Sequence, residues 1–170
     1  MAGGKTTFGE ALAARTGWSF IDLDREIEHA EGRSIADIMA SDGEEYFRRV
    51  ESRILKQTSA MKHVVVSCGG GTPCYRDNME FMTLHGMTLW RIASPERIAE
   101  RIRVAGDTRP LLSGKTDTEV EAFIVSHLKE RQPYYCRALW RLSGEHLENQ
   151  KEISDTVDAF LASFPLFNAK

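Results

Sequence analysis

Gly4, Lys5, Thr6 and Thr7 have the types and order of residues that bind phosphate groups. They match the second half of the pattern G-x-x-x-x-G-K-[ST], whose backbone N–H groups surround the phosphates of a nucleotide. Lys5 would then reach the β- and γ-phosphates, and the Thr6 hydroxyl would be a ligand of Mg²⁺. The first glycine of the pattern would fall two residues before Met1. Because so short a match also arises by chance, a nucleotide site needs support from the rest of the chain.

Two carboxylates, Asp22 and Asp24, end an apolar segment, residues 18–24, that we interpret as a strand. With the two-residue period of a strand, both side chains would point to the same side. Ligands of open α/β sheets bind beyond the carboxyl ends of the strands. One carboxylate would hold Mg²⁺ through water, and the other would orient or deprotonate an acceptor hydroxyl. The alternative is a solvated acidic turn.

Arg48 and Arg49 lie on a long helix predicted at residues 43–61. Adjacent residues point about 100° apart on a helix, so at most one of these arginines enters a site. The planar guanidinium group suits bidentate binding of a carboxylate. The alternative is a solvated charged helix face.

Three consecutive glycines, Gly69, Gly70 and Gly71, follow a β-branched strand predicted at residues 64–67. Each glycine costs conformational entropy on folding, so three in a row need a reason. We interpret this segment as a place where the backbone closely approaches a ligand.

Two further arginines lie in the second half of the chain. Arg109 belongs to a polar loop predicted at about residues 101–116, which suits a lid that closes over phosphates and excludes water. An exposed loop with an incidental arginine is the alternative. Arg131 follows a helix predicted at residues 119–130, where it would either interact with the helix dipole or hold a substrate.

Strands and helices alternate along the whole chain, which predicts βαβ units and a parallel sheet. A helix at residues 6–16 ends at Gly17, and a proline at the first helical position begins another helix at residue 95. We find no repeat, linker or low-complexity segment, so we expect one α/β domain over residues 1–170. The remaining predicted strands are 87–92 and 140–142, and the remaining helices begin near residues 24, 34 and 153.

Composition narrows the class of function. The net charge of −3 gives no basic surface for nucleic acid, so local arginines must bind any anionic substrate. No apolar run approaches the roughly 20 residues of a membrane span. The three cysteines lack metal-ligand spacing and fit free thiols in a reducing compartment. We therefore expect a cytoplasmic monomer with a small-molecule substrate, and neither nucleic acid nor membrane as a partner.

Taken together, these segments resemble the shikimate kinase family. The resemblance runs from Met1 to about Phe164 and rests on M-A-G-G-K-T-T, F-I-D-L-D, G-R-S-I-A-D-I, D-G-E-E-Y-F-R-R-V-E, G-G-G, R-P-L-L and R-Q-P-Y-Y. It implies a three-layer P-loop kinase fold and transfer of the γ-phosphate of ATP, with Mg²⁺, to the 3-hydroxyl of shikimate.

The resemblance also implies a role for each matched residue. Asp24 would contact the shikimate hydroxyls as the base, and Lys5 and Arg109 would assist phosphoryl transfer. The metal ligands would be Thr6 and Asp22. The shikimate site would comprise Asp24, Arg48, Gly69, Gly70, Gly71 and Arg131. The nucleotide site would comprise Gly3, Gly4, Lys5, Thr6, Thr7, Arg103 and Arg109, with Arg103 as an adenine-stacking residue.

One departure from the family pattern concerns the start of the chain. In the family, the strand before the phosphate loop is the central strand of the sheet, and this sequence has no apolar segment before Gly4. We therefore expect an N-terminally truncated family member whose sheet lacks its central strand. Two alternatives remain: a kinase for another polyol acid such as gluconate, and a non-catalytic P-loop relative.

Overall fold

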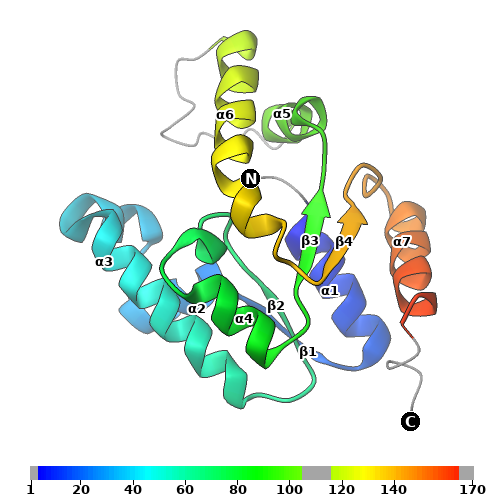
Figure 1. The fold of residues 1–170 in the computed structure, drawn as a ribbon, viewed down its shortest axis with the longest axis horizontal. Coiled ribbons are helices and arrows are strands. Elements are labelled where there is room, and N and C mark those ends of the chain that lie inside the picture. The colour runs from blue at the N-terminus through cyan, green and yellow to red at the C-terminus, as the bar shows by residue number, and fades with distance from the viewer. Residues whose placement is uncertain (1–3, 105–115, 165–170) are drawn as a thin grey trace.

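The computed structural model describes residues 4–104 and 116–164 (Figure 1). Helices alternate with parallel strands along the described chain, as the sequence predicts. The elements in order are α1 (Lys5–Thr16), β1 (Ser19–Asp22), α2 (Leu23–Glu31), α3 (Ile35–Gln57), η1 (Thr58–Ala60), β2 (Val64–Ser67), η2 (Thr72–Cys74), α4 (Asn78–His85), β3 (Leu89–Ile92), α5 (Pro95–Val104), α6 (Asp117–Tyr135), β4 (Trp140–Ser143) and α7 (Gln150–Ala162).

The four described strands form two separate parallel pairs. In the first pair, β1 runs beside β2 with Ser19 opposite Val64. In the second, β3 runs beside β4 with Leu89 opposite Trp140. Within the described residues β2 and β3 are not hydrogen-bonded to each other, and Figure 1 shows the two pairs apart. The parallel α/β class is confirmed.

Helix α1 is positioned by glycines at both ends and by its apolar face. Gly4 and Gly17 have φ angles of 69° and 72°, a region that favours glycine. Phe8 and Leu12 are buried in a cluster with Phe160 of α7. The Phe8 and Phe160 rings meet edge to face with centroids 5.5 Å apart. This packing fixes the helix start, where Lys5 and Thr6 lie, against the rest of the molecule.

The predicted strand at residues 18–24 is too long. Strand β1 stops at Asp22, and Asp24 lies in the first turn of α2. The Asp22 side chain accepts a hydrogen bond from the Asp24 N–H (3.1 Å), so Asp22 is the N-cap of α2. Capping satisfies a helix N–H that would otherwise lack a partner. The two carboxylates therefore stay adjacent because of a helix cap, and not because they alternate along a strand.

The two helices predicted to begin near residue 34 and at residue 43 are the two parts of α3, which ends at Gln57, before the predicted end at residue 61. Ser34 caps its start, accepting a hydrogen bond from the Asp37 N–H (3.1 Å). Gly43, with φ 79° and ψ 172°, interrupts the helical geometry and divides α3 into two parts. Phe47 and Ile54 of the second part pack with Leu23 of α2 in a buried cluster.

Three other predicted boundaries shift. Helix α5 continues to Val104, so residues 101–104 are helical and not part of a loop. The remainder of the expected lid, residues 105–115, lies outside the described residues. Helix α6 runs on to Tyr135, so Arg131 lies inside it and does not follow it. Helix α7 begins at Gln150, earlier than predicted, because the Asn149 side chain caps it.

Within the described ranges, none of the helices is long and apolar enough to cross a lipid bilayer.

Candidate active site

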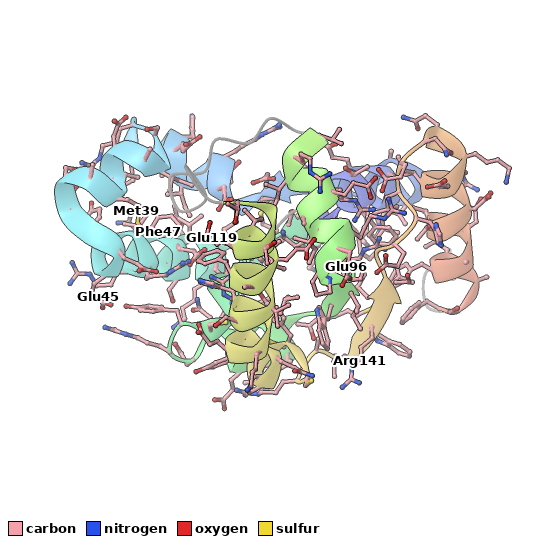
Figure 2. All side chains as sticks on the ribbon, turned by 90° about the horizontal axis from the view of Figure 1, so that it is seen from above. Met39, Glu45, Phe47, Glu96, Glu119 and Arg141 are labelled. Carbon is pink, nitrogen blue, oxygen red and sulfur yellow. The ribbon has the colours of Figure 1, made fainter. Side chains whose placement is uncertain are left out.

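A pocket of about 460 Å³ lies between α3, the glycine segment after β2, and α6. Its wall contains two of the predicted arginines, Arg48 and Arg131, together with Gly71, Cys74 and Tyr75. Figure 2 shows Glu45 and Phe47 on α3, the helix that supplies one wall. Glu44 and Glu45 also line it, so the pocket combines two arginines and two carboxylates with a closely approaching backbone.

Arg48 is held by carboxylates on its own helix. Its Nη1 atom donates to Glu51 Oε2 (2.7 Å), and Nη2 lies 3.3 Å from Glu44 Oε1. Arg49, by contrast, is exposed and lies over the ring of Tyr46. This agrees with the expectation that at most one of the two adjacent arginines enters a site.

Glu51 is a residue of this site that our sequence analysis missed. It is fully buried, and besides pairing with Arg48 it accepts a hydrogen bond from Thr72 Oγ1 (2.6 Å). A buried carboxylate needs such partners to offset the cost of its desolvation. The sequence feature that could have revealed it is a glutamate placed three residues after Arg48, between the core residues Val50 and Ile54.

The glycine segment approaches these side chains closely. A Cβ atom on Gly71 would lie only 2.6 Å from Cζ of Arg48. A Cβ atom on Gly69 would lie 3.2 Å from Glu51 Oε1 and 3.5 Å from Asp24 Oδ1. The carbonyl oxygen of Gly70 accepts a hydrogen bond from the Tyr135 hydroxyl (2.6 Å), which ties this segment to α6. Only glycine at position 71 leaves room for the guanidinium group.

Asp24 lies beside this pocket and beside the phosphate-loop lysine. Burial raises the pKa of the Asp24 carboxyl, and the nearby carboxylates of Asp22 and Glu51 raise it further. The charges of Lys5 and Arg48 act in the opposite direction. A carboxylate whose pKa is moved toward neutral pH is better suited to accept a proton from a hydroxyl group.

At the start of α1, the Thr6 hydroxyl donates to Asp22 Oδ2 (3.1 Å) and lies 3.4 Å from the Ser67 hydroxyl. Hydroxyl and carboxylate oxygens are the hard ligands that Mg²⁺ prefers, and it usually keeps several waters. Residues 4–104 and 116–164 contain no group of three or more His, Cys, Asp or Glu residues arranged to hold a metal. The predicted pair Thr6 and Asp22 therefore offers a sparse oxygen site at a helix N-terminus.

The other predicted nucleotide residues are less informative. Gly4 precedes the first residue of α1, as a phosphate loop requires, and Thr7 is exposed on that helix. Arg103 is exposed near the end of α5. Gly3 and Arg109 lie outside the described residues.

The fold and the site together define the P-loop kinase class of α/β proteins. The family model described as shikimate kinase matches residues 1–162. The chain belongs to the shikimate kinase family, whose members are phosphotransferases that use ATP as co-substrate.

Individual relatives agree with this assignment. A shikimate kinase from Parabacteroides distasonis is 38% identical over 161 residues, which cover 95% of this chain and 93% of that relative. The crystal structure of shikimate kinase from Bacteroides thetaiotaomicron matches with a TM-score of 0.93 and 36% identity, covering 98% of this chain and 94% of that one. Shikimate kinase from Acinetobacter baumannii in complex with shikimate matches with a TM-score of 0.84 and 30% identity, covering 100% and 91%.

Proposed function

We propose that this protein transfers the γ-phosphate of ATP to the 3-hydroxyl of shikimate, giving shikimate 3-phosphate and ADP. The observation that carries the proposal is the pocket containing Arg48 and Arg131, together with Asp24, whose carboxyl lies near enough to Arg48 and Lys5 for both charges to act on its pKa. Shikimate is a small monoacid with several hydroxyls, and this pocket offers cations for its carboxylate and a base for a hydroxyl.

In this mechanism Arg48 and Arg131 bind the shikimate carboxylate, and the backbone of residues 69–71 lines the ring. Asp24 accepts the proton of the 3-hydroxyl as its oxygen attacks the γ-phosphorus. The bond from the γ-phosphorus to the bridging oxygen breaks, and the electron pair leaves with ADP. Phosphoryl transfer depends mainly on such positioning and on neutralisation of charge.

The nucleotide side of the site is assigned to the start of α1. Lys5 neutralises phosphate charge, and the N–H groups of residues 4–6 bind phosphate oxygens at the helix N-terminus. Gly3, Thr7, Arg103 and Arg109 complete this proposed set, with Arg109 closing from a lid at about residues 101–116.

Thr6 and Asp22 would hold Mg²⁺, since their oxygens already lie 3.1 Å apart at this helix start. When bound, the ion neutralises charge on the phosphates. We also propose a single-domain monomer that acts in the cytoplasm, with neither nucleic acid nor membrane as a partner.

A substrate comparison tests the proposal. ADP release is measured with shikimate, with gluconate and with no acceptor, each in Mg²⁺ and in excess EDTA, and shikimate binding is measured separately by calorimetry. We expect turnover only with shikimate and Mg²⁺. Turnover with gluconate alone would overturn the substrate assignment. Shikimate binding without turnover by the folded protein would favour the non-catalytic alternative.

A further inference from the structure

Tyr135 is the last residue of α6 and connects two walls of the proposed substrate pocket. Its hydroxyl group donates a hydrogen bond to the carbonyl oxygen of Gly70 (2.6 Å), 65 residues earlier in the chain. Its ring lies beside the ring of Trp90 on β3, with centroids 5.7 Å apart. Because helix ends fray, these contacts stabilise the end of α6 and limit the positions that the hydroxyl group can take.

The hydrogen bond from Tyr135 sets the direction of one peptide group in the glycine segment. Peptide groups between glycines rotate readily, because no side chain restricts their φ and ψ angles. The Gly70 carbonyl oxygen can accept two hydrogen bonds, and the Cys74 thiol lies 3.8 Å from it as a second, weaker donor. In a trans peptide the N–H points away from the C=O, so these bonds also fix the direction of the Gly71 N–H.

Tyr135 also contacts Arg131, one helical turn earlier on α6. Residues four apart lie on the same face of a helix. Burial raises the pKa of the Tyr135 hydroxyl, while the charge of Arg131 and a hydrogen bond with it act in the opposite direction. A guanidinium group has only donors, so the Tyr135 oxygen accepts from Arg131 and donates its own proton to Gly70. One hydroxyl group thus joins the arginine to the glycine segment.

The two arginines of the pocket are held in different ways. Arg48 is paired with the carboxylates of Glu51 and Glu44. Within residues 4–104 and 116–164, Arg131 has no comparable ion pair, and Tyr135 is a neighbour that can orient it. A long side chain loses conformational entropy when it is fixed on a ligand, and a side chain that is already ordered loses less. Tyr135 therefore lowers the cost of binding a ligand through Arg131.

We propose that Tyr135 is a positioning residue, whose hydroxyl group holds Arg131 and the Gly70–Gly71 peptide in the arrangement that receives the carboxylate of the substrate. This inference rests on the proposed function, in which Arg131 binds that carboxylate. Tyr135 acts on substrate binding through its neighbours and takes no part in the transfer of the phosphoryl group. Loss of its hydroxyl group should therefore change the KM for shikimate and leave kcat nearly unchanged.

The first experiment compares Tyr135→Phe with Tyr134→Phe. Both substitutions keep an aromatic ring and remove one hydroxyl group, and among the described residues the Tyr134 hydroxyl makes no hydrogen bond like that of Tyr135. We expect Tyr135→Phe to raise the KM for shikimate about 3- to 10-fold and to change kcat less than about 2-fold. Tyr134→Phe should change both constants less than about 2-fold. Equal KM values for the two variants, or a lower Tm of Tyr135→Phe without a change in KM, would overturn the inference.

The second experiment tests whether Tyr135 acts through Arg131. Values of kcat/KM are measured for Arg131→Met, for Tyr135→Phe and for the double variant. If Tyr135 orients Arg131, the loss caused by Tyr135→Phe should be smaller when Arg131 is already replaced, because the two substitutions disrupt one arrangement. Losses that simply multiply would contradict action through Arg131.

The third experiment is independent of turnover. Hydrogen exchange is followed by mass spectrometry in the segment 68–75 of the ligand-free protein. We expect faster exchange in Tyr135→Phe than in the wild type or Tyr134→Phe, because the lost hydrogen bond frees the Gly70–Gly71 peptide. Identical exchange rates would overturn the inference even in an active enzyme. If the wild type does not turn over shikimate, the proposed function falls, and the exchange rates still decide whether Tyr135 orders the glycine segment.

Discussion

At the scale of single residues, the contrast between Arg48 and Arg49 is a direct test of the pocket. Arg48 lines it and Arg49 is exposed over Tyr46. We expect Arg48→Ala to raise the KM for shikimate about 10- to 100-fold, because the variant loses a pair of charge-assisted hydrogen bonds to the substrate carboxylate. Arg49→Ala is the matched control and should change KM less than about 2-fold. Steady-state kinetics measures KM for both variants. Equal effects of the two substitutions on KM would show that Arg48 does not bind shikimate.

Glu51 should act as a positioning residue through Arg48. Glu51→Gln keeps the shape of the side chain but removes the charge that pairs with Arg48 in a buried place. We expect a loss of about 1–3 kcal/mol in the free energy of unfolding, together with a higher KM for shikimate. The control, Glu44→Gln, removes the more exposed partner of Arg48 and should cost less than about 0.5 kcal/mol. Denaturant unfolding with parallel kinetics measures both, and a stability loss without any change in KM would leave Glu51 a purely structural role.

The raised pKa of Asp24 predicts the acid limb of the pH–rate profile. A base must be deprotonated to act, so kcat/KM should fall as pH decreases through the Asp24 pKa. Because burial and neighbouring carboxylates raise this pKa above 3.8, the fall should begin at a higher pH than for an ordinary aspartate. Glu51→Gln removes one of those charges and should move the acid limb to lower pH. If the acid limb of the Glu51→Gln variant were unchanged, the limb would not report the ionisation of Asp24.

At the scale of elements, the sequence predicted the type of most helices and strands correctly, but few of their first and last residues. Periodicity and glycines located α1 and β2, and the β-branched run 64–67 matched β2 fully. Sequence could not predict that Asp22 would act as a helix cap, because capping competes with strand extension over a single residue. It could not place Arg131 inside α6 either, since Pro133, two residues before the helix end, is a residue type that disfavours a helix interior. The Arg48–Glu51–Thr72 connection depends on contacts between α3 and η2, which no local pattern reveals.

Strand β3 carries a prediction of its own. Arg91 is buried there without a hydrogen-bond partner in the described structure, and desolvation lowers its pKa to about 10. Arg91→Leu should therefore raise the free energy of unfolding of this chain by about 1–3 kcal/mol. Arg141→Leu, opposite Trp90 on β4 and exposed, should change stability by less than about 0.5 kcal/mol. Thermal unfolding compares the two, and destabilisation by Arg91→Leu would show that Arg91 has acceptors after all.

At the scale of the whole molecule, the alkylation rates of the three cysteine thiols test both the burial of β2 and the position of the substrate pocket. Burial raises the pKa of Cys68 to about 12, and Cys136 is exposed. Alkylation at neutral pH should therefore modify Cys136 first and Cys68 last. Cys74 lines the pocket with Arg48 and Arg131, so shikimate should slow its modification and leave Cys136 unaffected. Mass spectrometry of each peptide over time gives the rates, and fast labelling of Cys68 would indicate that the fold opens around β2.

The central claim is that Asp24 and the two pocket arginines orient one hydroxyl of shikimate toward the nucleotide. The most direct measurement is NMR spectroscopy of the product formed from shikimate, ATP and Mg²⁺ with this protein. The account predicts a phosphoryl group on the 3-hydroxyl and on no other position. A phosphoryl group on a different hydroxyl, or ATP consumption that leaves shikimate unmodified, would contradict it.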